Sequence, residues 1–371
     1  MKKYSYGLAF IAILFSFISI TMVYSAAILN EQLSFTTVKK QITYIVIAFI
    51  IMIIVSFIDY HKYEKYTYVI YLITLVVLSL TLTGLGHSTK GAQRWIRFGG
   101  LNFQPSEFAK IAVIIYLSHS LSKKNIKLIK QFYIGVLPHM IFTGIVILLI
   151  LVEPDFGTSS IISMLLLTMM IIAGVKWRDV LLPFIFLSVA GYFLIMGSNY
   201  RSARLKAFLN PWEHRSNISY QLIESMLAFS SGGITGKGLG NSIQKQYYLP
   251  EAHTDFIAAV IGEELGFVGI VALMLLYCIL FYIIIRIALG ADSLFGTYVA
   301  ISIGILFFTQ AMLNLGVVSG GFPTKGLTLP FISFGGSSIV ASMIMIGIVL
   351  NISKNASYNK GDRPSIKERK I

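Results

Sequence analysis

Long uninterrupted runs of apolar residues constrain the fold of this chain more than any other feature. Several of them approach or exceed the roughly 18–20 residues that a helix needs to cross about 30 Å of hydrocarbon. Apolar residues make up 56% of the 371 residues, and charged residues only 12%. Because backbone polar groups must be satisfied internally in lipid, the expected spanning element is the α-helix. The sequence therefore predicts an all-α polytopic membrane protein.

Hydropathy and run length together predict about ten membrane-spanning helices. We expect residues 1–353 to form a single transmembrane domain, followed by a basic cytoplasmic tail over residues 354–371. The first apolar run is longer than the apolar region of a signal peptide, so we interpret it as a retained helix. The predicted spans are 7–29, 42–58, 68–84, 107–121, 132–152, 158–175, 180–197, 256–286, 294–318 and 334–352.

The basic residues indicate orientation. The formal net charge is +14, but the charges are scattered among short loops, as the positive-inside rule predicts. No zinc-ligand spacing or helix-turn-helix pattern accompanies them, so a nucleic-acid partner is not expected. Lysines and arginines crowd the connections at 123–130 and 176–178 and the tail. This pattern predicts a protein of the cytoplasmic membrane with both termini in the cytoplasm and a large outer loop over residues 198–255.

The outer loop ends in a dense polar cluster, which is unusual because ionisable groups are costly beside lipid. Asp255 lies where the loop meets the next predicted helix. Two interpretations stay open: a general base whose pKa is raised by partial burial, or an N-cap of that helix. Arg201 and Arg204 lie on the side that the positive-inside rule disfavours, which indicates an anionic ligand.

A glycine-rich stretch over residues 231–240 precedes the polar cluster. The phosphate-binding P-loop pattern requires a glycine where Ser231 stands, so a nucleotide site is not expected. We predict a turn between interfacial helices, since glycine commonly marks turns and loops.

Several motifs in fixed order carry a family resemblance. They are Gly91-Ala92-Gln93-Arg94-Trp95-Ile96 with Gln104-Pro105-Ser106-Glu107-Phe108-Ala109-Lys110, Glu153-Pro154-Asp155-Phe156-Gly157-Thr158, Tyr248-Leu249-Pro250-Glu251-Ala252-His253-Thr254-Asp255 with Gly262-Glu263-Glu264-Leu265-Gly266, and Asn314-Leu315-Gly316-Val317 with Leu329-Pro330-Phe331-Ile332-Ser333-Phe334-Gly335-Gly336-Ser337-Ser338. Together they span nearly the whole chain and resemble the SEDS family (shape, elongation, division, sporulation), whose members include FtsW, RodA and SpoVE.

The resemblance implies a ten-helix peptidoglycan glycosyltransferase that polymerises lipid II at the outer face of the cytoplasmic membrane. It also implies a class B penicillin-binding protein as the partner that supplies transpeptidation. Asp255 matches the essential aspartate of the family, and Arg94 and Trp95 match its motif in the first outer loop. The string Pro-Glu-Ala-His-Thr-Asp favours a division-type FtsW over a RodA, while elongation and sporulation roles stay open.

A glycan polymerase needs a base for the acceptor hydroxyl and positive charge for the departing diphosphate. Asp255 is the predicted catalytic base, and a divalent cation such as Mg²⁺ or Mn²⁺ is an alternative source of positive charge. The residues predicted to bind the substrate or its diphosphate are Arg94, Trp95, Glu107, Lys110, Arg201, Arg204, Lys245, Glu251, His253 and Thr254.

Some of these residues also fit purely structural roles. Glu107 and Lys110 are three residues apart, share a helix face and fit an ion pair equally well. Trp95 fits an interfacial anchor, because aromatic residues gather at that depth.

Two other functions stay open from the sequence. A transporter of the same lipid-linked precursor would need polar residues through the membrane interior. Apart from Glu107, Lys110, Asn314 and some hydroxyls, the predicted spans have few of them. A scaffold that only positions a penicillin-binding protein would need no outward carboxylate near cations. The expected partners of the polymerase are lipid II, that transpeptidase, division or elongation proteins and membrane lipid.

Overall fold

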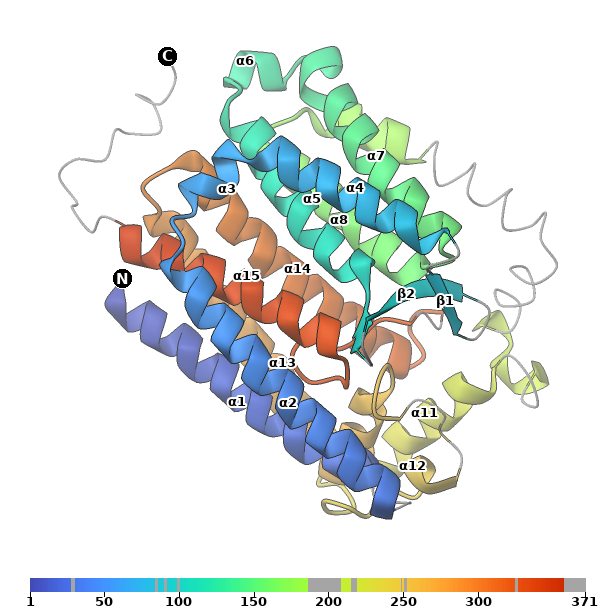
Figure 1. Cartoon of the computed structure of the whole chain (residues 1–371). Coiled ribbons are helices and arrows are strands. Elements are labelled where there is room, and N and C mark those ends of the chain that lie inside the picture. The colour runs from blue at the N-terminus through green and yellow to red at the C-terminus, as the bar shows by residue number, and fades with distance from the viewer. Residues whose placement is uncertain are drawn as a thin grey trace.

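The computed structural model describes residues 1–27, 31–83, 86–89, 92–98, 101–185, 208–214, 219–247, 249, 252–323 and 326–356. Most of them form helices that run side by side from one end of the molecule to the other (Figure 1). In chain order the helices are α1 (Lys2–Ala27), α2 (Glu31–Phe57), α3 (His61–Lys65), α4 (Thr67–Thr81), α5 (Pro105–Ser122), α6 (Ile126–Ile129), η1 (Phe132–Val136), α7 (Leu137–Val152), α8 (Phe156–Ala173), η2 (Pro211–His214), α11 (Tyr220–Gly232), α12 (Gln244–Tyr247), α13 (Ile257–Gly290), α14 (Leu294–Val318) and α15 (Gly336–Asn355).

Seven helices of the described chain are long and apolar enough to cross a membrane. Helix α4 is a shorter apolar helix, and α5 is almost entirely buried among the others. Every predicted span except 180–197 coincides largely with a described helix. Of that span, residues 180–185 are helical, whereas 186–207 and the tail from 357 lie outside the described residues. The all-α polytopic membrane architecture is therefore confirmed, and the count of ten spans stays a prediction.

The two ends of the bundle differ. The start of α1 and the end of α15 meet at one end, where the hydroxyls of Ser5 and Ser353 are hydrogen-bonded. Short helices α3 and α6 lie at this same end (Figure 1). Tyr60, just before α3, donates its backbone N–H to Oδ1 of Asn351 at 2.9 Å. The opposite end, which we call the sheet end, carries three short strands together with α11 and α12 (Figure 1).

The three strands form an antiparallel sheet that the hydropathy pattern does not predict. Strand β1 (Gly86–Thr89) pairs with β2 (Ala92–Phe98), which pairs with β3 (Leu101–Phe103). Ser88 lies opposite Gln93 and His87 opposite Trp95, so the register shifts at Arg94. An extra residue of this kind bends a strand and re-aims a side chain. Arg94 is therefore the residue at which β2 departs from regular pairing.

Helix α13 is interrupted near its start by Gly266, whose backbone (φ 67°, ψ −164°) is not helical. The glycine-rich stretch docks against this break: the N–H of Lys237 donates to the carbonyl of Glu263 at 3.0 Å, and that of Phe267 donates to the carbonyl of Gly233 at 2.9 Å. The stretch is thus more than a turn between helices. It supplies hydrogen-bond partners for backbone groups that the break leaves unpaired.

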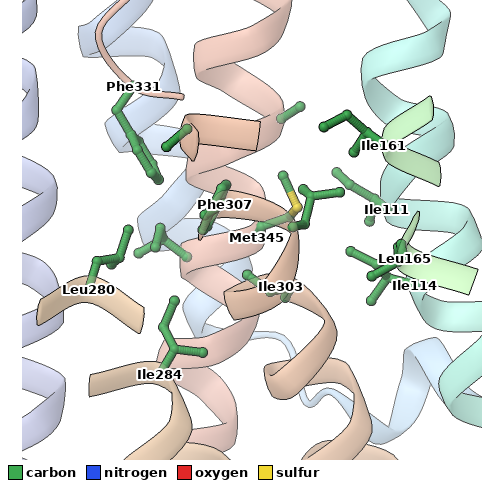
Figure 2. Close-up of a cluster of buried hydrophobic side chains, with 14 of the residues drawn as sticks. Ile111, Ile114, Ile161, Leu165, Leu280, Ile284, Ile303, Phe307, Phe331 and Met345 are labelled. Carbon is green, nitrogen blue, oxygen red and sulfur yellow. The ribbon is translucent and has the colours of Figure 1, made fainter. Parts of the chain in front are cut away.

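An apolar core fills the middle of the bundle. Side chains from α5, α8, α13, α14 and α15 meet there, as Figure 2 shows for Ile111, Ile114, Ile161, Leu165, Leu280, Ile284, Ile303, Phe307 and Met345. Phe331, from the connection between α14 and α15, joins this cluster, and its ring lies 4.8 Å from that of Phe307 and 5.4 Å from that of Phe15. The connection at the sheet end is therefore anchored in the core below it.

Candidate functional site

Asp255 lies at the sheet end, just before α13. The N-cap of that helix is Phe256, where no side-chain capping hydrogen bond is made. The side chain of Asn314, on α14, donates from Nδ2 to the main-chain oxygen of Asp255 at 2.9 Å and to that of Leu327 at 2.6 Å. One buried amide thus joins the aspartate segment to the connection between α14 and α15.

The side chains of Asp255 and of Arg94, on β2, both approach Gly326. A side-chain carbon at Gly326 would lie 3.2 Å from Oδ2 of Asp255 and 3.8 Å from Nη1 of Arg94. These two distances place the carboxylate oxygen and the guanidinium nitrogen no more than about 7 Å apart. Gly326 is exposed and both side chains are half-buried, so the pair borders an accessible part of the sheet end.

The turn between α7 and α8 positions Arg94. Its Nε donates to the main-chain oxygen of Glu153 at 3.2 Å, and its Nη2 donates to that of Pro154. The carboxyl of Glu153 is fully buried and accepts a hydrogen bond of 2.5 Å from the hydroxyl of Thr81, while its Oε2 has no partner among the described residues. Burial raises the pKa of Glu153 to about 7.

Glu107 and Lys110 form the ion pair that their spacing allows, with Nζ 2.8 Å from Oε2. Both are buried in α5, and Nζ of Lys110 also donates to Oε1 of Gln310 at 3.2 Å. Nε2 of Gln310 in turn donates to the main-chain oxygen of Thr328 at 2.9 Å. These contacts support the connection between α14 and α15, to which Thr328 belongs. The geometry therefore favours a structural role for Lys110.

His253 and Thr254 are fixed through their backbones. The main-chain oxygen of His253 accepts from the N–H of Phe334 at 2.9 Å, and that of Thr254 accepts from the hydroxyl of Ser333 at 2.7 Å. The rings of His253 and Phe334 are also in edge contact, with centroids 5.5 Å apart. Both predicted residues therefore lie beside Asp255 and the connection that leads into α15.

Lys245 is held in a second buried cluster. Its Nζ lies 2.5 Å from Oε1 of Glu264 and 2.8 Å from the hydroxyl of Ser25. The neighbouring Glu263 is paired with Lys237 at 2.7 Å. These contacts tie the segment before Asp255 to α13 and α1. They favour a structural role for Lys245, since its charge is already compensated by a buried carboxylate.

The remaining predicted residues are less informative. Trp95 is half-buried on β2, opposite His87 of β1. Arg201, Arg204 and Glu251 lie outside the described residues. In the described part of the chain, no group of three or more His, Cys, Asp or Glu side chains is arranged to hold a metal ion. Binding of Mg²⁺ or Mn²⁺ stays a prediction.

Three residues of the site are not among the predicted ones: Gly326, Glu153 and Asn314. Gly326 and Asp255 are far apart in sequence, so no local pattern could reveal their contact. Glu153 and Asn314 both belong to motifs of the family resemblance, and Asn314 is a polar residue in an apolar span. The sequence therefore does carry a signal for Asn314, because a polar side chain within a span marks function or a specific partner.

Comparison with known proteins decides the family. Residues 6–358 match the family model of FtsW, RodA and SpoVE, described as "Cell cycle protein". The chain belongs to the FtsW/RodA/SpoVE family.

Similar members of the FtsW/RodA/SpoVE family cover nearly the whole chain. A probable peptidoglycan glycosyltransferase FtsW of Geobacter sulfurreducens is 40% identical over 358 residues, which is 95% of this chain and 96% of the relative. Stage V sporulation protein E of Bacillus subtilis is 37% identical over 360 residues, covering 95% of this chain and 97% of the relative.

Solved structures agree with this assignment. A chain from a peptidoglycan synthase complex that coordinates polymerization and crosslinking superposes with a TM-score of 0.81 at 26% identity, over 95% of this chain and 98% of that chain. The rod shape determining protein RodA of Thermus thermophilus superposes with a TM-score of 0.70 at 25% identity, with the same coverage. The polytopic membrane fold of the family is therefore the fold of this chain.

The Lys245–Glu264 pair predicts a specific pattern of stability. Lys245→Met leaves the Glu264 carboxylate buried without its cation, which is expected to cost about 3–5 kcal/mol. The double variant Lys245→Met/Glu264→Gln should recover much of this loss, because no buried charge remains. The midpoint of thermal unfolding in detergent measures both effects. Lys237→Met, at a side chain 29% exposed, is the matched control with a smaller loss. A double variant no more stable than Lys245→Met would contradict the structural role of Lys245 as the cation that compensates Glu264.

Glu153 predicts a pH dependence of stability. Its pKa is raised from an ordinary value of 4.5 to about 7, so the folded state holds a proton that the unfolded chain releases. The contribution of Glu153 to the free energy of unfolding is fully present below pH 4.5 and is lost as the pH rises through 7. This change is on the order of 3 kcal/mol. Glu153→Gln should differ little from the wild type at pH 5 and be more stable at pH 8, by thermal unfolding midpoint. Parallel curves for the two proteins would exclude the buried, protonated carboxyl.

Proposed function

We propose that this chain is a peptidoglycan glycosyltransferase that polymerises lipid II. The main support is the approach of the Asp255 carboxylate and the Arg94 guanidinium to one place beside the exposed backbone of Gly326. A base and a cation that border one accessible space are what a glycosyl transfer with a diphosphate leaving group requires.

In the proposed reaction, the acceptor hydroxyl oxygen attacks the anomeric carbon of the donor sugar. The new glycosidic C–O bond forms as the bond from that carbon to the diphosphate oxygen breaks, and undecaprenyl diphosphate leaves with the electron pair. Asp255 takes the hydroxyl proton, and Arg94 stabilises the charge on the leaving group. One base is enough, because a diphosphate departs without the protonation that a glycosidase must supply.

The buried cations fit this chemistry less well than Arg94. Lys110 and Lys245 are 3% and 4% exposed, and each is bound to a carboxylate. Freeing either charge for a ligand would leave Glu107 or Glu264 buried and unpaired, which is costly.

We further infer that the sheet end faces outward. The lysine-rich connection over residues 123–130 lies at the opposite end, together with the start of α1 and the end of α15 (Figure 1). Lysine-rich short loops mark the cytoplasmic side. Both termini would then lie in the cytoplasm, and lipid II would be used at the outer face of the cytoplasmic membrane.

A transporter of the same precursor is supported less well. The middle of the bundle between α5, α8 and α14 is filled by apolar side chains such as Ile114, Leu165 and Phe307 (Figure 2). Such packing offers no polar route for a sugar headgroup through this part of the bundle. A scaffold without chemistry would not require the approach of Asp255 and Arg94 to one space.

The proposed partner is a class B penicillin-binding protein that supplies crosslinking. The support is the likeness to a chain of a peptidoglycan synthase complex in which polymerization and crosslinking are coordinated. The relatives include both a probable FtsW and a stage V sporulation protein, so the growth phase in which this chain acts is left open.

The test is polymerisation of labelled lipid II by the purified complex with its transpeptidase. Asp255→Asn should lower the rate by at least about 10²-fold, because the amide cannot accept the hydroxyl proton. The unfolding midpoint and complex formation should not change. Asp59→Asn is the matched control, since Asp59 is an exposed aspartate at the other end of the bundle. Undiminished glycan chains from Asp255→Asn would refute the assigned base, and an inactive wild-type complex would refute the proposed function.

A further inference from the structure

We propose that Gly326 determines access to the site: its lack of a side chain keeps open the space in which a glycosyl diphosphate meets Asp255 and Arg94 together. This inference rests on the proposed function. It assigns a role to a residue that makes no chemical contribution of its own.

A side chain at position 326 would project toward both functional groups. At 3.2 Å from Oδ2 of Asp255, a carbon would be closer than ordinary van der Waals contact, and at 3.8 Å from Nη1 of Arg94 it would touch the guanidinium. Among the described residues, chain neighbours aside, no other atom lies within 4 Å of that carbon. Such a side chain would therefore stand against the two groups that the reaction uses.

Close packing of the backbone does not exclude a side chain at this position, because Gly326 is exposed. A side chain there would instead enter the space beside Asp255 and Arg94.

The connection that carries Gly326 cannot easily retreat. The main-chain oxygen of Leu327 is bound by Asn314 at 2.6 Å, and that of Thr328 by Gln310 at 2.9 Å. The side chain of Leu327 is buried against Gly157 at the start of α8, where an added carbon would come within 2.8 Å of it. The segment that follows Gly326 is thus fixed from two helices.

The facing groups are restrained as well. Asn314 holds the main-chain oxygen of Asp255 at 2.9 Å, and the main-chain oxygens of Glu153 and Pro154 hold Arg94. A side chain at position 326 would consequently compete with the substrate for the space. The substrate that fits beside a carboxylate and a guanidinium is a sugar with a hydroxyl or anomeric centre near the first group and a diphosphate near the second.

The experiment is a size series at one position, measured in the full complex with labelled lipid II. We expect Gly326→Ala to lower kcat/KM about tenfold and Gly326→Leu at least about 10²-fold, since displacement of reacting groups by about 1 Å can cost that much. The unfolding midpoint should stay near that of the wild type. Gly335→Ala is the matched control in the same connection, because its added carbon meets only Cβ of Ser338, at 3.8 Å. It should retain wild-type activity.

A binding measurement separates blocked access of lipid II to the site from a folding defect. In an Asp255→Asn background, which prevents turnover, Gly326→Leu should weaken lipid II binding at least about tenfold, or 1.4 kcal/mol. Near wild-type activity of Gly326→Leu, unchanged binding in the Asp255→Asn background, or a rate loss matched by a fall in the unfolding midpoint would each overturn the inference. If the wild type is active, Asp255→Asn inactive and Gly326→Leu active, the inference fails while the proposed function stands.

Discussion

The site depends on one buried amide. Both hydrogens of the Asn314 side-chain amide are used, one on the main-chain oxygen of Asp255 and one on that of Leu327. Because Asn314 is 2% exposed, water cannot readily replace either bond. The backbone of Asp255 and the path of the connection beside it are therefore set together by a residue of α14. Arg94 reaches the same place from a different direction, through the turn between α7 and α8.

The positive charges that the structure describes near the site divide into two kinds. Lys110 and Lys245 are buried and bound to acids, as the cost of burying an unpaired cation requires. They join helices and loops at the sheet end. Arg94 is half-buried, and its guanidinium combines hydrogen bonds to main-chain oxygens with the approach of Nη1 to Gly326. A planar group with five N–H donors can do both, which a lysine ammonium cannot do as readily.

The sequence predicts the described long helices well because a long apolar run in lipid has few alternatives to a helix. It also predicts Asp255 as the base and Arg94 as a substrate-binding residue, through their place in motifs and at a loop boundary, and the structure brings both beside Gly326. It misses the sheet, whose strands are too short to give a sustained alternating pattern. It cannot reveal that Gly326 lies beside Asp255 or that Lys245 is paired with Glu264, because such contacts depend on how distant helix ends pack.

The proposed reaction requires an accessible space at the outer face, bordered by Asp255, Arg94 and Gly326. Cysteine labelling in intact cells tests this requirement most directly, in a Cys278→Ser background that removes the single native cysteine. We expect Gly326→Cys to react with a maleimide that cannot cross the membrane, whereas Lys127→Cys should react only after the cytoplasmic side is opened. Reaction of Gly326→Cys only after that opening would contradict an outward-facing site.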